Sequence, residues 1–474
     1  MLFNSFNFWL IFPFIFSFYW LIPSKYSIFK KWFLILVSYL LYMNWKPYFA
    51  LILFYVTSIT YLGGILFENR DKIKKKLVVG LVLLAIFPLL TYKYYDFLNN
   101  SVIHLLELMG CRLTFVGLNW AIPVGISFYT FQALGYMWDV YYGKIKAERK
   151  FSDYVLYCAF FPQIASGPIS RYSELMPQIK QFHSFDYRQA CDGLKVLLWG
   201  MFYKVVIADR LGLFVNSVYQ YYDHYSGLTL LEASFYYSIQ IYCDFAGYSM
   251  MAVGISKILG FDLINNFRQP YFADSVTDFW KRWHISLTRW LTTYIYIPLG
   301  GNRCSKKRQY YNIIVTFFIS GLWHGANWTF IFWGLLHSFF QIVEKILGLD
   351  PKGKYGMLGT RNNKLYLRPF RIVLTLLMVD IAWIFFRMPS IIDAFNVLKC
   401  IVFHPLDGKL LLPGDKIIFF GGICIFLIKE IWDEFFPNKF VSNKILRYSI
   451  YMFIFVMILS IGVLDSGQFI YVNF

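Results

Sequence analysis

The sequence is poor in charge, and poor in acidic residues above all. Only 15% of its 474 residues are charged, with 27 Asp and Glu against 45 Lys and Arg. Hydrophobic residues make up 58% of the chain and aromatic residues 22%. A water-soluble domain of this size cannot bury so large a fraction of apolar side chains in its core. The shortage of charge therefore excludes an ordinary soluble protein and predicts that lipid surrounds much of the chain.

Several patterns that mark common enzyme and binding classes are missing. The seven cysteines are scattered, with no C-x-x-C pair and no histidines at zinc-finger spacing, so neither a disulfide framework nor a metal site is predicted. Nothing resembles a P-loop, a dinucleotide fingerprint or a G-x-S-x-G elbow, which leaves soluble-type ATPases and hydrolases unsupported. The net charge of +18 comes from basic residues in short loops between apolar runs, and these form no single polar face. No nucleic-acid partner is expected.

Long apolar runs are what the chain has instead. A bilayer core about 30 Å thick takes roughly 20 helical residues to cross. The runs lie at about residues 8–22, 32–44, 48–67, 77–95, 194–217, 228–257, 310–347, 368–388, 416–431 and 447–464. We expect an all-α, polytopic integral membrane protein with about 10–12 transmembrane or re-entrant helices around a central cavity. With no soluble segment and no repeat, residues 1–474 are interpreted as one membrane domain.

Basic loops orient these spans. The loops at residues 25–31 and 70–76 are rich in Lys and Arg, whereas the intervening turn at 44–47 is nearly neutral. Cytoplasmic loops carry the excess of Lys and Arg, so both loops are predicted to be cytoplasmic and the N-terminus extracytoplasmic. The first apolar run has no basic leader and no small-x-small cleavage site, which predicts an uncleaved span. Three more basic clusters are assigned to the cytoplasm, at residues 144–150, 303–308 and 352–371.

Two further apolar stretches, residues 123–143 and 160–168, are interrupted by Pro and Gly. Non-helical backbone persists at membrane depth only where protein or a water-filled cavity satisfies its polar groups. We therefore expect both stretches to be re-entrant elements that line a cavity.

Residues 276–291 show helical periodicity with tryptophans on one face. Trp280, Trp283 and Trp290 share that face, and charged residues occupy much of the other. This pattern predicts one interfacial helix that lies on the membrane with a tryptophan belt. His284 falls at the edge of the apolar stripe. An amphipathic anchor whose histidine merely forms a hydrogen bond is an equally good interpretation.

His324 is a histidine within the apolar run 310–347, which leaves and returns to the same side of the membrane. Ionisable groups inside a membrane are costly, and they usually line a pathway or react. Gly321 and Gly325 flank His324 and allow another backbone or a ligand to approach closely. A structural histidine satisfied by a neighbouring helix is the alternative. For His337, thirteen residues further on, the structural interpretation is preferred.

Asp244 is another polar group inside apolar sequence, with Gln240 one turn earlier. Gly247 and Gly254 suit tight packing between helices. A buried contact that fixes helix pairing and a role in an active site both remain open for Asp244.

Several strings in the chain, taken together and in order, resemble the membrane-bound O-acyltransferase family, and most closely its alginate O-acetylation branch. The core strings are DFWKRWHISL at 278–287, YIPLGGNR at 296–303 and GLWHGA at 321–326. Supporting strings are PVGISFYTFQ at 123–132, FFPQIASGPISRY at 160–172, DFAGYS at 244–249 and AWIFFR at 382–387. The resemblance covers nearly the whole chain.

The resemblance implies that His324 is the catalytic histidine and His284 the family's second histidine. Acyl transfer needs a base for the hydroxyl proton, a task that suits a neutral imidazole. The implied donor is acetyl-CoA on the cytoplasmic side, with no metal or prosthetic group. Its phosphates are expected to meet a group of basic residues. The alternative is that these charges serve only to orient the chain in the membrane. The basic residues are Lys281, Arg282, Arg303, Lys306, Lys307 and Arg308.

The implied acceptor is a hydroxyl of an extracytoplasmic polysaccharide, reached directly or through a periplasmic or membrane-anchored SGNH-type acetyltransferase partner. The implied location is the bacterial inner membrane. Met250 and Thr292-Thr293 depart from the family's usual Asp and Arg-Asp, which leaves substrate and partner open. Three alternatives stay in view: the family's D-alanyl transfer branch, a transporter or flippase that uses the same intramembrane polar residues, and a scaffold without turnover.

Overall fold

The computed structural model describes residues 3–68, 74–111, 116–349, 367–411, 416–437 and 443–464. Within these ranges the chain is helical and contains no β-sheet, apart from an isolated bridge between Tyr225 and Lys409. The all-α class predicted from the apolar runs is confirmed. Arg70, Lys72 and most of the basic cluster at 352–371 lie outside the described residues.

Six helical segments in the described ranges are long and apolar enough to cross a membrane. In lipid, a helix satisfies the backbone polar groups of such a run internally. The segments are Ser24–Met43, Phe49–Phe67, Lys75–Leu108, Trp328–Leu347, Arg368–Arg387 and Lys444–Ile461. Each overlaps a run predicted from the sequence, which confirms a multi-pass membrane protein.

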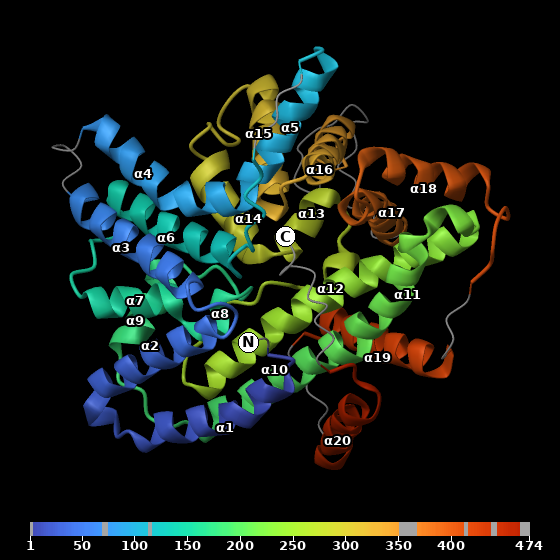
Figure 1. The fold of residues 1–474 in the computed structure, drawn as a ribbon. Helices are drawn as coiled ribbons and strands as arrows, with labels where there is room; N and C mark the ends of the chain where they lie inside the picture. The colour runs from blue at the N-terminus through green and yellow to red at the C-terminus, as the bar shows by residue number, and fades with distance from the viewer. Residues whose placement is uncertain are drawn as a thin grey trace. The chain divides into compact units, whose positions relative to one another are not determined.

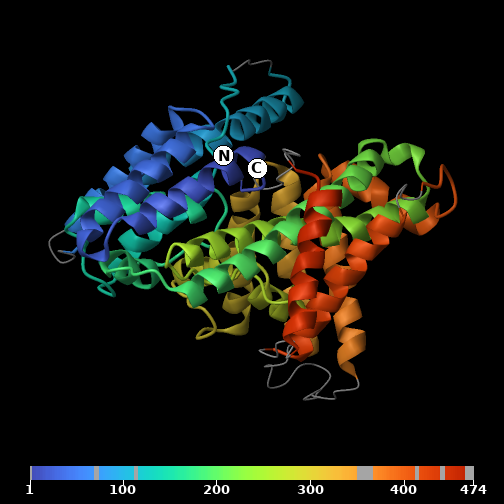
Figure 2. The ribbon, with the colours of Figure 1, turned by 90° about the horizontal axis from the view of Figure 1, so that it is seen from below.

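The chain forms two compact units, each with its own internal packing. The first contains the described residues of Met1–Leu194 together with Ala252–Ile264. In this unit α3 packs against α4 and α6, and α2 packs against α7; these are the blue and teal helices of Figure 2. Its helices, labelled in Figure 1, are α1 (Phe6–Leu21), α2 (Ser27–Met43), α3 (Phe49–Phe67), α4 (Lys75–Leu89), α5 (Tyr95–Leu108), α6 (Ile126–Tyr141), α7 (Phe151–Ala159), α8 (Phe161–Ile164) and α9 (Tyr172–Lys180).

The stretch 123–143 is a continuous helix over most of its length, so the prediction of non-helical backbone there is wrong. Its proline and its first and last glycines fall outside α6, so they do not break the helix. Gly125 has a φ of 74°, and a Cβ on it would lie 1.9 Å from the carbonyl oxygen of Ile164. Glycine is therefore required where α8 passes the start of α6. The second stretch, 160–168, contains α8 and a turn.

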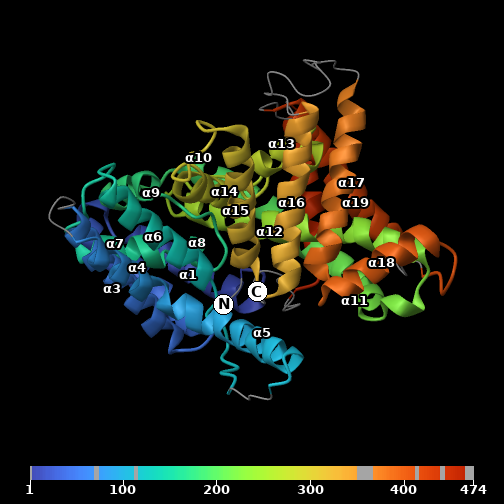
Figure 3. The same ribbon diagram turned by 90° about the horizontal axis from the view of Figure 1, so that it is seen from above.

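The second unit contains the described residues of Lys195–Met251 and Asn265–Ile470. Helices α15, α16 and α17 run side by side in it (Figure 3). Helices α10 (Tyr187–Met201) and α12 (Gly227–Ile258) contribute residues to both units. The other helices of this unit are α11 (Asp209–Gln220), α13 (Val276–Arg282), α14 (Ile285–Leu291), α15 (Lys306–His324), α16 (Trp328–Leu347), α17 (Arg368–Arg387), α18 (Ile391–Phe403), α19 (Lys416–Phe435) and α20 (Lys444–Ile461).

Helices α15 and α16 form an antiparallel pair over the predicted hairpin at 310–347. A Cβ on Gly321 would lie 2.4 Å from the carbonyl oxygen of Phe330, and one on Gly334 would lie 2.3 Å from that of Phe317. A Cβ on Gly325 would lie 2.1 Å from the Phe330 ring. The glycines that flank His324 therefore admit the neighbouring helix, which is the first of the two possibilities considered for them.

Three short π-helical segments widen the helices of the described chain. They are η3 (Leu90–Tyr94), η4 (Phe202–Ala208) and η7 (Thr292–Tyr296). Such segments are rare in proteins, and those that occur are frequently found at functional sites. The first two hold buried lysines, Lys93 and Lys204, with exposed fractions of 6% and 0%. The third contributes to the wall of a cavity in the second unit.

Candidate active site

His324 is the last residue of α15, and its side chain lies among aromatic rings. Only 1% of the residue is exposed. The imidazole centroid lies 5.0 Å from that of Trp323, 4.8 Å from that of Trp333 and 5.5 Å from that of Phe386. The position thus excludes bulk water and holds the ring in a defined place.

His284 occupies the break between α13 and α14 and has a left-handed backbone, with φ of 41° and ψ of 56°. That conformation costs a non-glycine residue roughly 1–2 kcal/mol. Asn266 holds the turn: its carbonyl oxygen accepts from the backbone N–H of Ile285 at 2.9 Å, and its side-chain Oδ1 accepts from that of Ser286 at 3.1 Å. Strained backbone of this kind gathers at functional sites.

The predicted interfacial helix at 276–291 is therefore wrong in two respects. It is two helices, and its tryptophan face is buried inside the second unit: Trp280 is 5% exposed, Trp283 0% and Trp290 8%. The ring of Trp280 packs on Trp333 at 5.6 Å, and the ring of Trp283 packs on Trp383 at 5.1 Å. An apolar stripe has the same periodicity whether lipid or neighbouring helices cover it, so the pattern alone did not distinguish the two.

The two predicted histidines meet at one indole. The ring centroid of Trp323 lies 5.5 Å from that of His284 and 5.0 Å from that of His324. Phe245 of α12 is a second aromatic neighbour of His284, with the two ring centroids 4.7 Å apart. Burial lowers the pKa of His284 to about 3, so its imidazole stays neutral at physiological pH. A group with that pKa suits hydrogen bonding and orientation better than proton uptake.

His337 adjoins this pair through Trp333, whose ring lies 4.8 Å from His324 and 4.9 Å from His337. It is fully buried, and its Nδ1 accepts a 3.3 Å hydrogen bond from the indole Nε1 of Trp280. An accepting Nδ1 places the proton of the neutral ring on Nε2. Among the described residues, Nε2 of His337 has no hydrogen-bond partner. The sequence favoured a structural role for His337. The structure adds that His337 contacts Trp333, which also contacts His324.

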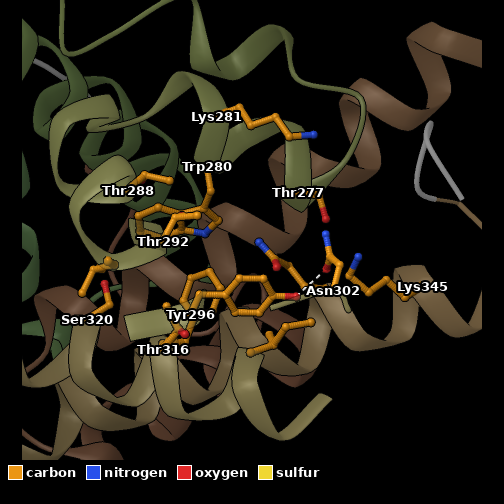
Figure 4. A pocket seen from close by; sticks show the side chains of 14 residues that line it. Thr277, Trp280, Lys281, Thr288, Thr292, Tyr296, Asn302, Thr316, Ser320 and Lys345 are labelled. Carbon is orange, nitrogen blue, oxygen red and sulfur yellow. Dashed lines mark hydrogen bonds between the residues drawn. The ribbon is translucent and has the colours of Figure 1, made fainter. Parts of the chain in front are cut away.

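A cavity of about 230 Å³ lies between α13, α14, η7, α15 and α16 (Figure 4), and in the described part of the chain its wall includes Trp280, which contacts His337, but none of the three histidines. Its wall combines apolar side chains with hydroxyl groups and two lysines. Thr292, one of the departures from the family pattern, belongs to it. The lining residues are Thr277, Trp280, Lys281, Thr288, Leu291, Thr292, Tyr296, Asn302, Ile313, Thr316, Phe317, Ser320, Gln341 and Lys345.

The basic residues proposed from the sequence have different surroundings. Lys281 is exposed and lines the cavity. Arg303 is exposed and follows Asn302 of the cavity wall. Arg282 donates to Asp278 at 2.7 Å and to Glu434 at 2.7 Å, so its guanidinium ties α13 to α19. Lys281 is thus the residue of this group best placed to meet a ligand in the cavity.

Asp244 belongs to a buried ion cluster. The Lys204 ammonium lies 2.6 Å from carboxylate oxygens of both Asp209 and Asp244, and Lys204 has no exposed surface. A Cβ on Gly200 would lie 2.7 Å from the carbonyl oxygen of Gly247, so α10 and α12 touch beside the cluster. Of the two interpretations left open for Asp244, these contacts favour the fixing of helix pairing. The next residue carries the aromatic ring that contacts His284.

Glu344 is a residue that the sequence patterns did not single out. Its carboxylate accepts from the backbone N–H of Val276 at 2.5 Å and from that of Thr277 at 3.2 Å. It thereby caps the first turn of α13, where backbone N–H groups lack intrahelical partners. Because Glu344 lies far along the chain in α16, no local pattern announces this contact.

Comparison with known proteins places these features in one family. The model of the membrane-bound O-acyltransferase family matches residues 145–349, which include all three histidines and the whole cavity. The chain is 37% identical over 307 residues to a probable alginate O-acetylase AlgI of Azotobacter vinelandii, covering 65% of this chain and 58% of that protein. The chain therefore spans a little under three fifths of the length of this relative.

Two further relatives carry different names. The chain is 35% identical over 367 residues to a peptidoglycan O-acetyltransferase of Helicobacter pylori, covering 71% of this chain and 66% of that protein. It is 28% identical over 298 residues to a teichoic acid D-alanyltransferase of Bacillus subtilis, covering 61% and 73%. All three relatives are named as enzymes that transfer an acyl group, and their names differ in the group moved and in the acceptor.

Proposed function

The chain belongs to the membrane-bound O-acyltransferase family, and we propose that it moves an acyl group from a thioester donor towards a hydroxyl of an extracytoplasmic polysaccharide. The observation that carries this proposal is the meeting of His284 and His324 at the indole of Trp323, with ring centroids 5.5 and 5.0 Å away. Two imidazoles in a water-poor aromatic setting supply a base and an orienting group for acyl transfer.

In the proposed reaction His324 acts as the general base. It takes the proton of the acceptor hydroxyl while the hydroxyl oxygen attacks the carbonyl carbon of the thioester. A C–O bond forms, and the carbonyl oxygen becomes an oxyanion. Collapse of this intermediate restores the carbonyl and breaks the C–S bond, and the proton passes from His324 to the leaving thiolate. His284, neutral at physiological pH, orients the reacting groups.

The proposed donor is acetyl-CoA, and the cavity is its proposed binding place. Lys281 and Lys345 offer cations to phosphates, and the mixed apolar and hydroxyl wall suits an arm that carries amide groups. Arg303 is exposed next to the cavity and is a further candidate for the phosphates. Arg282 is proposed to support this site indirectly, through the ion pairs that hold α13.

The relatives' names support the proposed class of acceptor. Identities of 37% to an alginate O-acetylase and 35% to a peptidoglycan O-acetyltransferase support a polysaccharide outside the cytoplasm. We propose that an SGNH-type acetyltransferase, periplasmic or membrane-anchored, receives or relays the acyl group. We further propose that the protein resides in the bacterial inner membrane, surrounded by lipid, with its N-terminus extracytoplasmic and the loop before α15 cytoplasmic.

Transfer of D-alanine from a carrier protein is a second candidate, favoured by the 28% identity to a teichoic acid D-alanyltransferase. It would use the same histidines and a different donor. The identity to the acetyltransferases is higher, at 35–37%. Acetyl transfer is therefore the first choice.

The test uses purified protein in lipid nanodiscs supplied with acetyl-CoA labelled in the acetyl group and with a soluble polysaccharide whose free hydroxyl groups serve as acceptor. We expect cleavage of the thioester, measured as released thiol, and this cleavage should disappear in His324→Gln. His404→Gln is the matched control because His404 is exposed and pairs with Asp407 at 2.9 Å, away from the aromatic cluster. If a D-alanyl carrier protein is the only donor that gives product, the second candidate, D-alanyl transfer, is supported instead. No cleavage of either donor, with flux of a substrate across proteoliposomes, would replace the transferase by a transporter.

Orientation is tested separately in intact cells. A cysteine substituted for Lys306, which is exposed at the start of α15, should resist a membrane-impermeant thiol reagent and react after permeabilisation. A cysteine at Tyr26 serves as a second cytoplasmic position in the loop before α2. Rapid labelling of both positions in intact cells would invert the topology.

A further inference from the structure

Ser320 has a buried hydroxyl group that the mechanism above does not use. The residue is 2% exposed, and its Oγ has no hydrogen-bond partner among the described residues. Serine and threonine in helices commonly donate to a carbonyl three or four residues earlier. Thr316, one turn before Ser320, does so to Asn312 at 2.7 Å, and Ser338 on α16 does so to Leu335 at 2.7 Å. The hydroxyl of Ser320 is thus left for another acceptor.

A hydrogen-bond acceptor for Ser320 can come from a ligand bound in the cavity. Ser320 lines it, together with Thr316 from the preceding turn of α15. His324 is four residues further along the same helix, so Ser320 and His324 lie on one face, about 6 Å apart along the axis. A ligand that fills the cavity up to Ser320 therefore ends one helical turn from the proposed base.

The cavity has a direction. Because α15 and α16 are antiparallel, Lys345 near the end of α16 lies towards the start of α15, and Ser320 lies towards its histidine end. Figure 4 shows Ser320 and Lys345 at opposite sides of the cavity, with Trp280 and Tyr296 between them. A donor with phosphates at one end and a thioester at the other matches this polarity, with the phosphates at Lys345 and the thioester at Ser320.

Other hydroxyl groups of the cavity wall, apart from that of the exposed Thr292, already have acceptors. Thr288 donates to the carbonyl oxygen of Trp283 at 3.3 Å. Tyr296 donates to Oδ1 of Asn302 at 2.6 Å. Thr277 donates to the carboxylate of Glu344 at 3.4 Å. Ser320 is set apart from these residues by a buried donor that the described protein does not satisfy.

We propose that the Ser320 hydroxyl donates a hydrogen bond to the carbonyl oxygen of the bound thioester. The inference rests on the proposed function. In the ground state this bond aligns the carbonyl carbon with His324. When the acceptor oxygen attacks, the carbonyl oxygen gains negative charge, and the same bond strengthens. Ser320 touches the reacting group and is a catalytic residue in that sense.

The test compares Ser320→Ala with Ser338→Ala in nanodiscs. Both serines are 2% exposed in adjacent helices, but Ser338 is satisfied by its own helix and does not line the cavity. Removal of one donor to an oxyanion typically lowers kcat roughly 100- to 1,000-fold. We expect that loss for Ser320→Ala with acetyl-CoA, a small change in KM, and near-normal activity for Ser338→Ala. Ser320→Cys, a weaker donor of similar size, should fall between Ala and wild type.

Two additional measurements separate the possible outcomes. Thermal unfolding of Ser320→Ala should be unchanged or slightly improved, because the substitution removes a buried hydroxyl that the protein leaves unsatisfied. Acetonyl-CoA, a thioether that keeps the carbonyl and resists cleavage, should bind Ser320→Ala about 2- to 10-fold more weakly than wild type. Wild-type kcat in a well-folded Ser320→Ala overturns the inference and leaves the proposed function standing. A wild type that neither cleaves acetyl-CoA nor binds acetonyl-CoA overturns the proposed donor itself.

Discussion

The indole N–H of Trp280 donates to Nδ1 of His337 across 3.3 Å, joining α13 to α16. Trp280 lines the cavity, and His337 contacts the same Trp333 ring as His324, at 4.9 and 4.8 Å. One hydrogen bond thus connects the cavity wall to the aromatic surroundings of the proposed base. Both partners are buried, with exposed fractions of 5% and 0%, so loss of either leaves the other unsatisfied.

Trp280→Phe is expected to destabilise the protein by about 1–3 kcal/mol, because Nδ1 of His337 loses its donor in a place that water does not reach. Trp280→Phe combined with His337→Phe should cost less than the sum of the single changes, with a coupling of about 0.5–3 kcal/mol. The measurement is a double-mutant cycle of thermal unfolding in detergent. Trp333→Phe is the control, since its indole nitrogen has no hydrogen-bond partner among the described residues. Strictly additive losses at Trp280 and His337 would contradict this account.

The acid sensitivity of the protein should depend on His284. Its folded-state pKa of about 3 is lower than the unfolded value near 6.5. Between these values the unfolded state binds the extra proton, so the contribution of His284 is complete above pH 6.5. It declines by about 1.4 kcal/mol per pH unit as the pH falls towards 3. Unfolding midpoints measured from pH 7.5 to 4.5 should therefore fall less steeply for His284→Gln than for wild type. Identical slopes for His284→Gln and wild type would refute the burial argument.

The buried cluster around Lys204 predicts a large loss of stability when Lys204 is replaced, and a partial recovery when the carboxylates are neutralised as well. Lys204→Met leaves the carboxylates of Asp209 and Asp244 buried without their shared cation, which typically costs about 3–5 kcal/mol. Neutralising all three groups as Lys204→Met with Asp209→Asn and Asp244→Asn should recover part of the loss. Lys257→Met is the control, since Lys257 meets Asp262 at 3.3 Å near the surface, where about 0–1 kcal/mol is at stake. Equal effects of Lys204→Met and Lys257→Met on the unfolding midpoint would show that the cluster is not sealed from solvent.

Hydropathy predicted the membrane spans well because a long apolar run in lipid must satisfy its backbone polar groups internally, which a helix does. The runs at 48–67 and 368–388 correspond closely to Phe49–Phe67 and Arg368–Arg387. Prediction failed where prolines and glycines lie at helix ends, as in 123–143. It also failed to find α18 (Ile391–Phe403), which is too short to register as a span. Composition detects spans, whereas the ends of helices depend on individual backbone positions such as Gly125.

The candidate site was predictable only in part, for a similar reason. His324 stood out because an ionisable group in an apolar run is costly, and His284 because of its resemblance to a family string. Neither the left-handed backbone at His284 nor the cap that Glu344 gives to α13 has a local signature. Ser320 was indistinguishable from an ordinary helical serine, since its missing acceptor becomes visible only when α15 and α16 are packed together.

His324→Gln is the decisive substitution for the proposed base. Glutamine keeps hydrogen-bonding capacity and similar length, but its amide takes up no proton at neutral pH. Removal of a general base typically costs roughly 100- to 10,000-fold in rate, so thioester cleavage should become undetectable while the protein still accumulates in the membrane. His324→Ala should be equally inactive, and His284→Ala should be impaired with residual activity. His337→Gln serves as the comparison, because it changes a ring in contact with the same tryptophan. If His324 were held only for packing, His324→Gln would lose thermal stability along with abundance or would remain active. A stable and active His324→Gln protein would remove His324 from the mechanism and leave the second histidine or a bound partner as the source of the base.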